Sequence, residues 1–225
     1  LAGSRLEENV KLALLASRSG DGGKSTLIGH SGKAQPMMAA LSNATAGVAL
    51  EVDEGSRLGG GHPAIHVTPA AFAIGEEKGS TGKQVLESII AGYEVTSRIG
   101  GATRSRHEIH SHGTWGTLGS AAASGLLMGF DADGVRSSIN LAASMSPANT
   151  WTPCFEGATI RNLYPGRSNF QGILAANLSQ CGFTGINDGP KDIYSSVLGE
   201  GFDAEQAVAG LGHLGEYRIQ QNYFK

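Results

Sequence analysis

Residues 107–122 read HEIHSHGTWGTLGSAA, three histidines followed by a turn rich in glycine and threonine. A run of small and apolar residues, 121–129, follows directly, and small residues let helix backbones approach closely. We expect a helix to begin near Thr114, where the unpaired N–H groups of its first turn would suit a carboxylate. Titratable side chains beside such a helix start indicate a site for small acids.

The composition excludes several classes of protein. The 225 residues include 17 basic and 20 acidic ones without a basic stripe, which argues against a nucleic-acid partner. The apolar runs are far shorter than a membrane span and no signal-peptide pattern opens the chain, so we expect no membrane partner. Two cysteines cannot form a disulfide framework, which favours a cytoplasmic location.

The apolar periodicity predicts an all-α fold, because helical repeats dominate and no alternating strand pattern persists. The capping-box spacing of Thr81 and Gln84 opens a clear amphipathic helix. Proline at a first turn and aspartate at an N-cap mark further starts. The predicted helix starts are Pro36, Pro69, Thr81 and Asp131.

The three histidines allow three interpretations. His107, His110 and His112 are close enough in sequence to share a metal ion, but H-x-x-H-x-H matches no standard helical zinc pattern. They can also be solvated or satisfied within the core. Otherwise one of them is an acid–base group, since imidazole titrates near neutral pH. His110, next to the turn, is the candidate we favour.

Charged residues elsewhere carry similar alternatives. Glu51, Asp53 and Glu54 are either a solvated helix end or carboxylates that raise one another's pKa and so exchange protons. His62 follows three glycines, where it either caps a turn or meets a ligand. Arg161 and Arg167 flank a predicted turn, as surface residues or as a clamp for a carboxylate.

Four collinear segments together resemble the MmgE/PrpD family. They are LEVDEGSRLGGGHPAIHVTPAAFAIGEE (50–77), GKQVLESIIAGYEVTSRIG (82–100), HSHGTWGTLGSAAASGLLMGFD (110–131) and EGATIRNLYPGRSNFQGILAANLSQCGFTG (156–185). The family includes 2-methylcitrate dehydratase, cis-aconitate decarboxylase and iminodisuccinate epimerase. The resemblance covers nearly the whole chain and is far more specific for the family than for a substrate.

The resemblance implies a large helical domain and a smaller α+β domain with the active site between them, usually in a homodimer. It implies small di- or tricarboxylate substrates and no metal or organic cofactor. We therefore expect residues 1–225 to form a single helical domain, incomplete at both ends relative to the family and lacking the α+β domain. Such a chain alone would hold part of an active site.

The family's motifs can be carried onto this chain residue by residue. Its acidic motif, typically Asp-Phe-Asp-Asp, falls on Glu51-Val-Asp53-Glu54, and its Gly-His-Pro histidine falls on His62. The histidine before the Gly-Thr turn is placed at His110. The resulting catalytic candidates are Glu51, Asp53, His62 and His110. The substrate-binding candidates are Arg57, Gly113, Thr114, Arg161 and Tyr164, with no metal ligand among them.

Two positions depart from the family. Tyr164 stands where many members have histidine, and Arg161 stands where the decarboxylase and dehydratase members have lysine. Arginine stays protonated, so it can hold a carboxylate but does not readily shuttle protons, which favours an epimerase-like reaction. We expect a lyase or isomerase that moves a proton at a carbon next to a carboxylate. The alternative is a non-catalytic helical module for oligomerisation or ligand binding.

Overall fold

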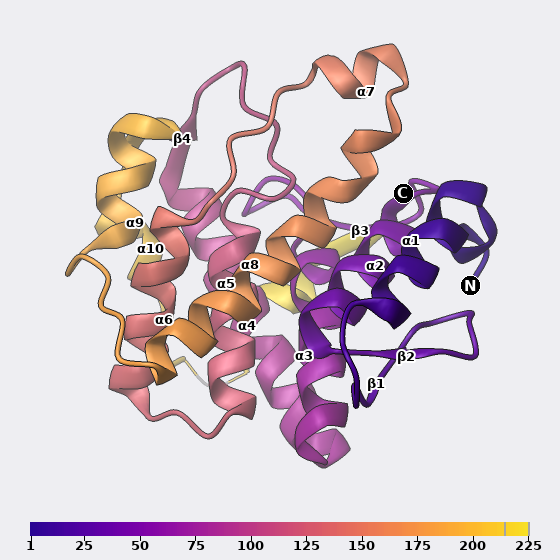
Figure 1. The fold of residues 1–225 in the computed structure, drawn as a ribbon. Helices are drawn as coiled ribbons and strands as arrows, with labels where there is room; N and C mark the ends of the chain where they lie inside the picture. Colours follow the sequence, from indigo (N-terminus) through magenta and orange to yellow (C-terminus); the bar gives the residue numbers. More distant parts are fainter. Residues whose placement is uncertain (214, 225) are drawn as a thin grey trace.

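The computed structural model describes residues 1–213 and 215–224 and shows a bundle of helices (Figure 1). The α-helices are α1 (Glu7–Arg18), α2 (Pro36–Val48), α3 (Pro63–Lys78), α4 (Gly82–Ala102), α5 (Gly116–Leu127), α6 (Ala132–Ser144), α7 (Thr152–Glu156), α8 (Leu163–Gln180), α9 (Gly189–Asp192) and α10 (Ala204–Val208). Tighter or wider turns of helix are η1 (Gly3–Arg5), η2 (Thr159–Asn162), η3 (Ile193–Val197) and η4 (Arg218–Gln221).

Helix α5 is the central element, since it packs against α3, α4, α6 and α8. Nearly all of its residues are buried, and most of them are glycine, alanine, serine or threonine. A Cβ atom at Gly119 would overlap the Thr96 hydroxyl and the Gly92 carbonyl of α4, so only glycine permits this approach. The small residues of 116–127 therefore set the distances between the helices around them.

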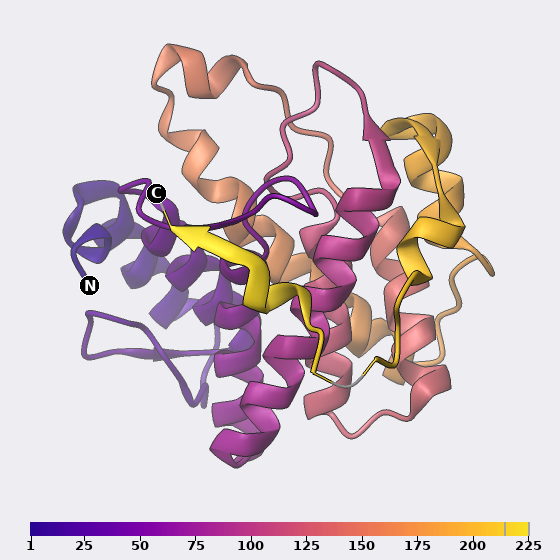
Figure 2. The same cartoon turned by 180° about the vertical axis from the view of Figure 1, so that it is seen from behind.

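Short strands make the fold less purely helical than predicted. They are β1 (Ser25–Thr26), β2 (Lys33–Ala34), β3 (Glu54–Ser56), β4 (Thr103–Ser105), β5 (Gly199–Phe202) and β6 (Asn222–Phe224). In the described part of the chain they form three two-stranded antiparallel pairs, β1–β2, β3–β6 and β4–β5. Figure 2 shows β6 lying against the early part of the chain. Strands of two to four residues are too short to produce an alternating pattern in the sequence.

The prediction that a helix begins at Pro69 is wrong, because α3 begins at Pro63 and Pro69 lies inside it. A proline within a helix has no N–H for the carbonyl four residues earlier, here that of Ile65. The buried side chain of Asn169 in α8 donates its Nδ2 to this carbonyl at 2.9 Å. Its Oδ1 accepts the N–H of Ala70 at 2.9 Å. One amide thus compensates for the proline, and α3 continues through it.

The predicted helix starts at Pro36, Thr81 and Asp131 are confirmed. Helix α2 begins at Pro36, and Thr81 and Gln84 form the expected capping box at the start of α4. Asp131 caps α6 by accepting the N–H of Gly134 at 2.9 Å. Residues 161–167, however, are not a turn, since α8 begins at Leu163 and Arg167 lies within it. Among the described residues, no helix has the length and apolar character needed to cross a membrane.

Replacement of Asn169 by alanine is expected to lower the free energy of unfolding by about 3 kcal/mol, because it leaves buried backbone groups of α3 without hydrogen-bond partners. Urea unfolding followed by circular dichroism measures this change. Asn162→Ala is the matched control, since its side chain caps no helix and is half-buried. Equal losses in the two variants would contradict the assigned role of Asn169.

Candidate active site

Four imidazoles from two segments meet at one place in the bundle. His62 immediately precedes α3 and His66 lies in its first turn, whereas His110 and His112 lie in the loop before α5. His112 is central: its ring stacks on that of His62 with centroids 4.7 Å apart. The rings of His66 and His110 lie 5.3 Å and 5.0 Å from it. The helix that the sequence placed near Thr114 begins at Gly116.

The acidic segment 51–54, which runs from the loop after α2 into the first residue of β3, supplies carboxylates to three different partners. Glu51 forms an ion pair with the buried guanidinium of Arg161. Asp53 Oδ2 lies 3.4 Å from Nδ1 of His62. Glu54 Oε2 accepts a backbone N–H in the first turn of α3 at 3.0 Å. The motif is therefore divided between an arginine, a histidine and a helix start, instead of forming a solvated helix end.

Glu51 has an unusual backbone conformation. Its φ is +56°, and among the residues that the structure describes it is the only one other than glycine with a positive φ. This left-handed conformation is unfavourable for residues with a Cβ atom, and such strain is concentrated at functional sites. The conformation accompanies the ion pair between Glu51 and Arg161. We take it as support for a functional role of the pair.

Hydrogen bonds indicate which ring nitrogen carries the proton in two of the histidines. Nδ1 of His62 lies 2.5 Å from the backbone carbonyl of Glu54, and a carbonyl only accepts, so Nδ1 is protonated. In neutral His62, Nε2 then has the lone pair. Nδ1 of His110 accepts the N–H of His112 at 3.0 Å, so neutral His110 carries its proton on Nε2. One imidazole is thus arranged as a base and the other as a proton donor.

Two of the buried imidazoles are held neutral. Burial lowers the pKa of His66 to about 3, and the neighbouring His62, His110 and Arg161 act in the same direction. Burial likewise lowers the pKa of His112 well below its ordinary value, again with help from the nearby cationic groups. Nε2 of His112 lies 3.4 Å from a guanidinium nitrogen of Arg161.

Asn149 holds the loop that carries His110 and His112. Its Nδ2 donates to the carbonyl of His112 at 2.8 Å, and its carbonyl accepts the N–H of His110 at 2.7 Å. Arg167 donates to Asn149 Oδ1 at 2.6 Å. Arg167 therefore supports the site from α8 by fixing an asparagine, rather than by reaching the imidazoles itself.

Of the remaining predicted residues, Tyr164 contacts a histidine of the cluster, whereas the others are described by different contacts. Tyr164 places its ring 5.7 Å from that of His110, and burial raises the pKa of its hydroxyl. Thr114 is fully buried, and its hydroxyl donates to Ser111 within its own turn. Gly113 has a φ of +89° in that turn. Arg57 lies over the ring of Tyr223 in β6, which is its described contact.

Three residues of this cluster or in contact with it are absent from the predicted catalytic and binding candidates. His66 could have been found from its spacing, since His62 and His66 share one helix face once α3 starts at Pro63. His112 directly precedes Gly113 and Thr114, yet His110 was the preferred candidate among the three histidines of 107–112. Asn149 carried no sequence signal, because it acts through contacts that only the folded chain brings together.

A cleft of 910 Å³ opens beside the histidines. It is lined by the glycines preceding His62, by Ser111 between His110 and His112, and by apolar side chains that include Trp151. Trp151 also packs against His110, with ring centroids 4.0 Å apart. The cleft has room for a small organic acid, and its lining includes residues adjacent in sequence to His62, His110 and His112 but not the four clustered imidazoles themselves.

Buried histidines with lowered pKa values, gathered with carboxylates and an arginine, mark this part of the helical domain as a candidate active site. The model of the MmgE/PrpD N-terminal domain matches residues 1–199, and the chain belongs to this family. It is similar to cis-aconitate decarboxylase of Aspergillus terreus, with 27% identity over 208 residues. It is also similar to cis-aconitate decarboxylase-like protein oryM of Aspergillus oryzae, with 26% identity over 212 residues. These alignments cover 84% and 88% of the chain but only 42% of each relative.

The neutral, buried imidazoles predict that stability falls in acid. An unfolded His66 binds a proton near pH 6.5, whereas the folded one does so only near pH 3. Between these values the unfolded state holds the extra proton, so the free energy of unfolding decreases by about 1.4 kcal/mol per pH unit as the pH falls. His112 adds to this loss in the same direction.

Urea unfolding at a series of pH values tests this expectation. His66→Gln should reduce the pH slope by about one proton, and His107→Gln, which removes an exposed imidazole, should not. A wild-type slope in His66→Gln would mean that His66 is not the group responsible.

Proposed function

We propose that this domain provides the carboxylate clamp and the proton-transfer histidines of a lyase or isomerase acting on a small di- or tricarboxylate. One observation carries the proposal. A buried arginine contacts His112, which stacks on His62, and His62 is in turn oriented by a carboxylate and a carbonyl. The cation, Arg161, and the proposed base, His62, thus both contact His112. A cation near a base is what removal of a proton from a carbon next to a carboxylate requires.

Arg161 would bind a substrate carboxylate through its forked N–H donors. Arg161 is 7% exposed, so charge-assisted hydrogen bonds there are stronger than in water. Glu51 holds the guanidinium in the absence of substrate, and its side chain is about half exposed. A substrate carboxylate can therefore replace Glu51 without a larger rearrangement of the buried site.

His62 is the proposed base. Its Nε2 takes the proton from the carbon next to the carboxylate, and the electron pair of the broken C–H bond moves into the carboxylate held by Arg161. Asp53 stabilises the imidazolium formed at His62, from which it is 3.4 Å away. His110 is the proposed acid and gives its Nε2 proton either to a departing hydroxyl group or to the carbon. The first outcome is dehydration and the second is epimerisation.

Arg161 supports the epimerase-like outcome because it stands where the decarboxylase and dehydratase members have lysine. A guanidinium stabilises the enediolate but does not readily shuttle protons as a lysine can, so His110 returns the proton to the carbon. The two fungal relatives are named as a cis-aconitate decarboxylase and a decarboxylase-like protein, which supports a lyase. We propose no cofactor, since the arrangement supplies a base, an acid and a cation. A cytoplasmic location stays a prediction.

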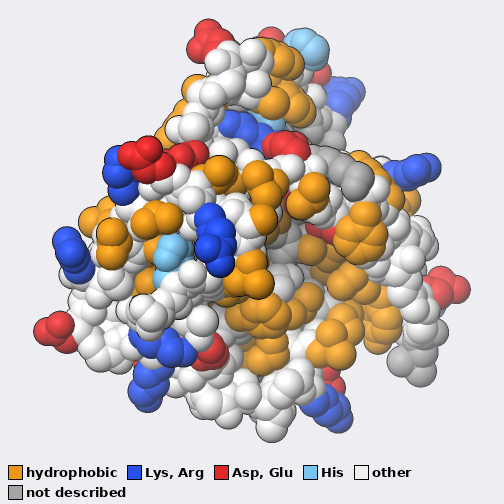
Figure 3. All heavy atoms as spheres, turned by 90° about the vertical axis from the view of Figure 1, so that its right-hand side faces the viewer, with side chains coloured by type: hydrophobic (Ala, Val, Ile, Leu, Met, Phe, Trp, Pro, Cys, Tyr) orange, Lys and Arg blue, Asp and Glu red, His pale blue; other side chains and the backbone are white. Residues whose placement is uncertain are grey.

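The homodimer implied by the family resemblance also stays a prediction. Figure 3 looks onto the side where α1, β1 and β2 lie, and apolar side chains gather over this face. A hollow of 740 Å³ lined by Ile28, Phe72 and Leu86, among others, belongs to the apolar surface of the domain. Such a surface is typical of protein contacts. It also suits the alternative function, a non-catalytic module for oligomerisation.

Exchange of substrate protons for deuterium separates the enzyme from this alternative. We expect the complete gene product containing this domain to introduce deuterium next to a carboxylate in at least one member of a panel of hydroxy- and amino-dicarboxylates and of tricarboxylates. His62→Gln should slow exchange by roughly 10²–10⁴-fold, because it removes the base. Proton NMR in heavy water measures the rate.

The control for this experiment is His213→Gln, an exposed imidazole that does not line the cleft. Near-normal exchange in His62→Gln would contradict the assignment of the base. An absence of exchange with every acid, in wild-type protein that binds dicarboxylates, would favour the non-catalytic module. Release of carbon dioxide or growth of C=C ultraviolet absorbance identifies decarboxylation or dehydration.

Arg161→Lys tests the carboxylate clamp separately. Lysine keeps the charge but lacks the planar fork, so we expect KM to rise about tenfold or more. Steady-state kinetics on the substrate identified by exchange gives this value. An unchanged KM would show that Arg161 does not hold the substrate.

A further inference from the structure

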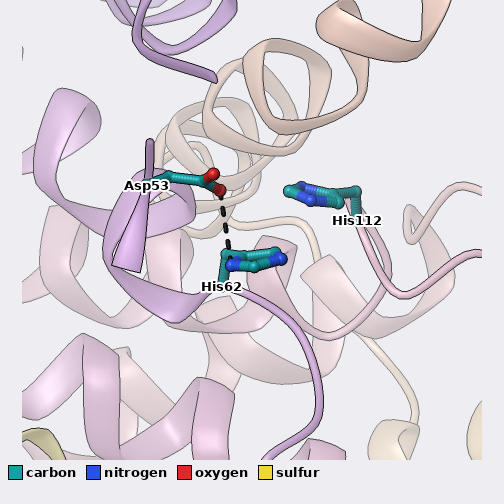
Figure 4. Close-up of side chains that lie close together, drawn as sticks. All are labelled: Asp53, His62 and His112. Atoms are coloured by element: carbon teal, nitrogen blue, oxygen red, sulfur yellow. Dashed lines mark ion pairs between the residues drawn. The ribbon is translucent and has the colours of Figure 1, made fainter. Parts of the chain in front are cut away.

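Strand β3 holds His62 through its backbone. The carbonyl of Glu54 accepts the Nδ1 proton of His62, and the N–H of Ser56 donates to the carbonyl of Gly61, directly before the histidine, at 2.9 Å. Asp53, the residue before β3, forms the ion pair with His62 that Figure 4 shows. The carbonyl and the carboxylate that orient the His62 ring therefore belong to β3 or adjoin it. The position of this strand decides the position of the proposed base.

Strand β6 is the partner of β3. Among the described residues β3 pairs with this strand alone, and Figure 2 shows β6 arriving from the other end of the chain. The antiparallel register places Gly55 opposite Tyr223. Two strands of three residues each are marginal without further contacts. Side chains must therefore contribute to keeping β6 on β3.

Tyr223 supplies such contacts. A Cβ atom at Gly55 would lie 2.4 Å from Cζ of the Tyr223 ring and 2.6 Å from its Oη, so the ring packs directly on the backbone of β3. The guanidinium of Arg57, the residue after β3, lies over the same ring at 5.4 Å from its centroid, within the range of a cation–π contact. The ring thus contacts the middle of β3 and the residue that follows it.

The segment that leads to β6 is tied to α4 by a buried ion pair. Nε of Arg98 lies 2.8 Å from the Glu94 carboxylate, and both side chains are almost fully enclosed. Glu94 also accepts the N–H of Arg218, and Arg98 donates to the carbonyl of Ala209 at 2.7 Å. The bundle therefore fixes the chain on its way to β6, and the strand reaches β3 from a defined direction.

We propose that Tyr223 is a positioning residue for the proposed base. Its ring holds β6 on β3, and through β3 it holds Asp53 and His62 in the arrangement that accepts a proton. Arg57, a predicted substrate-binding residue, contributes through the Tyr223 ring and not through the substrate. The effect on catalysis rests on the proposed function, whereas the effect on His62 is a property of the protein without substrate.

Nuclear magnetic resonance of the complete gene product, labelled with ¹⁵N-histidine, tests this role. The hydrogen-bonded Nδ1 proton of His62 should give a slowly exchanging signal, identified by its absence in His62→Gln. Tyr223→Ala should lose this signal and Tyr223→Phe, which keeps the ring, should retain it. Phe224→Ala is the matched control, because Phe224 lies in the same strand with 74% of its surface exposed.

A retained His62 signal in Tyr223→Ala, or an equal loss in Phe224→Ala, would overturn the proposal. Gly55→Ala covers a failure of Tyr223→Ala to fold, because its added methyl group displaces the ring without removing it. The His62 signal should be lost there too, and its retention would contradict the role of the ring. The spectra need no substrate, so they decide the role of Tyr223 even where the exchange experiment finds no reaction.

Steady-state kinetics separates positioning from substrate binding. Tyr223→Ala should lower kcat about tenfold or more, because a small displacement of a catalytic group is costly. KM should stay within about twofold, since the proposed carboxylate site, Arg161, is carried by η2 and not by β3. Arg57→Gln should lower kcat about two- to fivefold, the value of an exposed cation–π contact. A raised KM with unchanged kcat in Arg57→Gln would make Arg57 a substrate-binding residue and refute its assigned role.

Discussion

The side chain of Asn169 joins the two helices that carry the candidate site. From α8 it donates to the Ile65 carbonyl and accepts the Ala70 N–H, on either side of the proline in α3. It also donates to the carbonyl of Pro165 at 2.7 Å, within its own helix. Helix α3 follows His62, and α8 follows Arg161. The relative position of the imidazole and the guanidinium therefore depends on one buried amide.

The central helix α5 imposes the complementary constraint. A Cβ at Gly116 would overlap the ring of His66, so the first residue of α5 must be glycine for that imidazole to keep its place. The ring is consequently enclosed and neutral. Close packing, which the small residues of 116–127 allow, thus also sets the electrostatic character of the site.

Much of this organisation follows from the sequence, and the remainder depends on contacts that the sequence does not encode locally. The helical class, the capping box of Thr81 and the cap at Asp131 are local features, and each was predicted. The start of α3 was misplaced because Pro69 is normally a helix breaker, and its compensation comes from a residue 100 positions later. The pairing of β3 with β6 joins segments still farther apart.

The candidate site shows the same division. Motifs located Glu51, Asp53, His62 and Arg161, which lie together, because each motif is contiguous. The choice of His110 over its neighbour could not be made from spacing, since both precede the turn. Only the structure shows that His112 lies between the rings of His62 and His110. Asn149 could not be predicted either, because its contacts with His110 and His112 form only in the folded chain.

With Arg161 as the proposed carboxylate site, its ion pair with Glu51 supplies a competitor for that site from the same chain. A ligand that takes Glu51's place exchanges one carboxylate for another, so the number of ion pairs on the arginine is conserved. The affinity for a ligand then depends on the difference in free energy between two similar complexes, Arg161 with the ligand carboxylate and Arg161 with Glu51. The left-handed backbone of Glu51, which costs on the order of 1–2 kcal/mol, weakens the internal complex and shifts that balance toward the incoming acid.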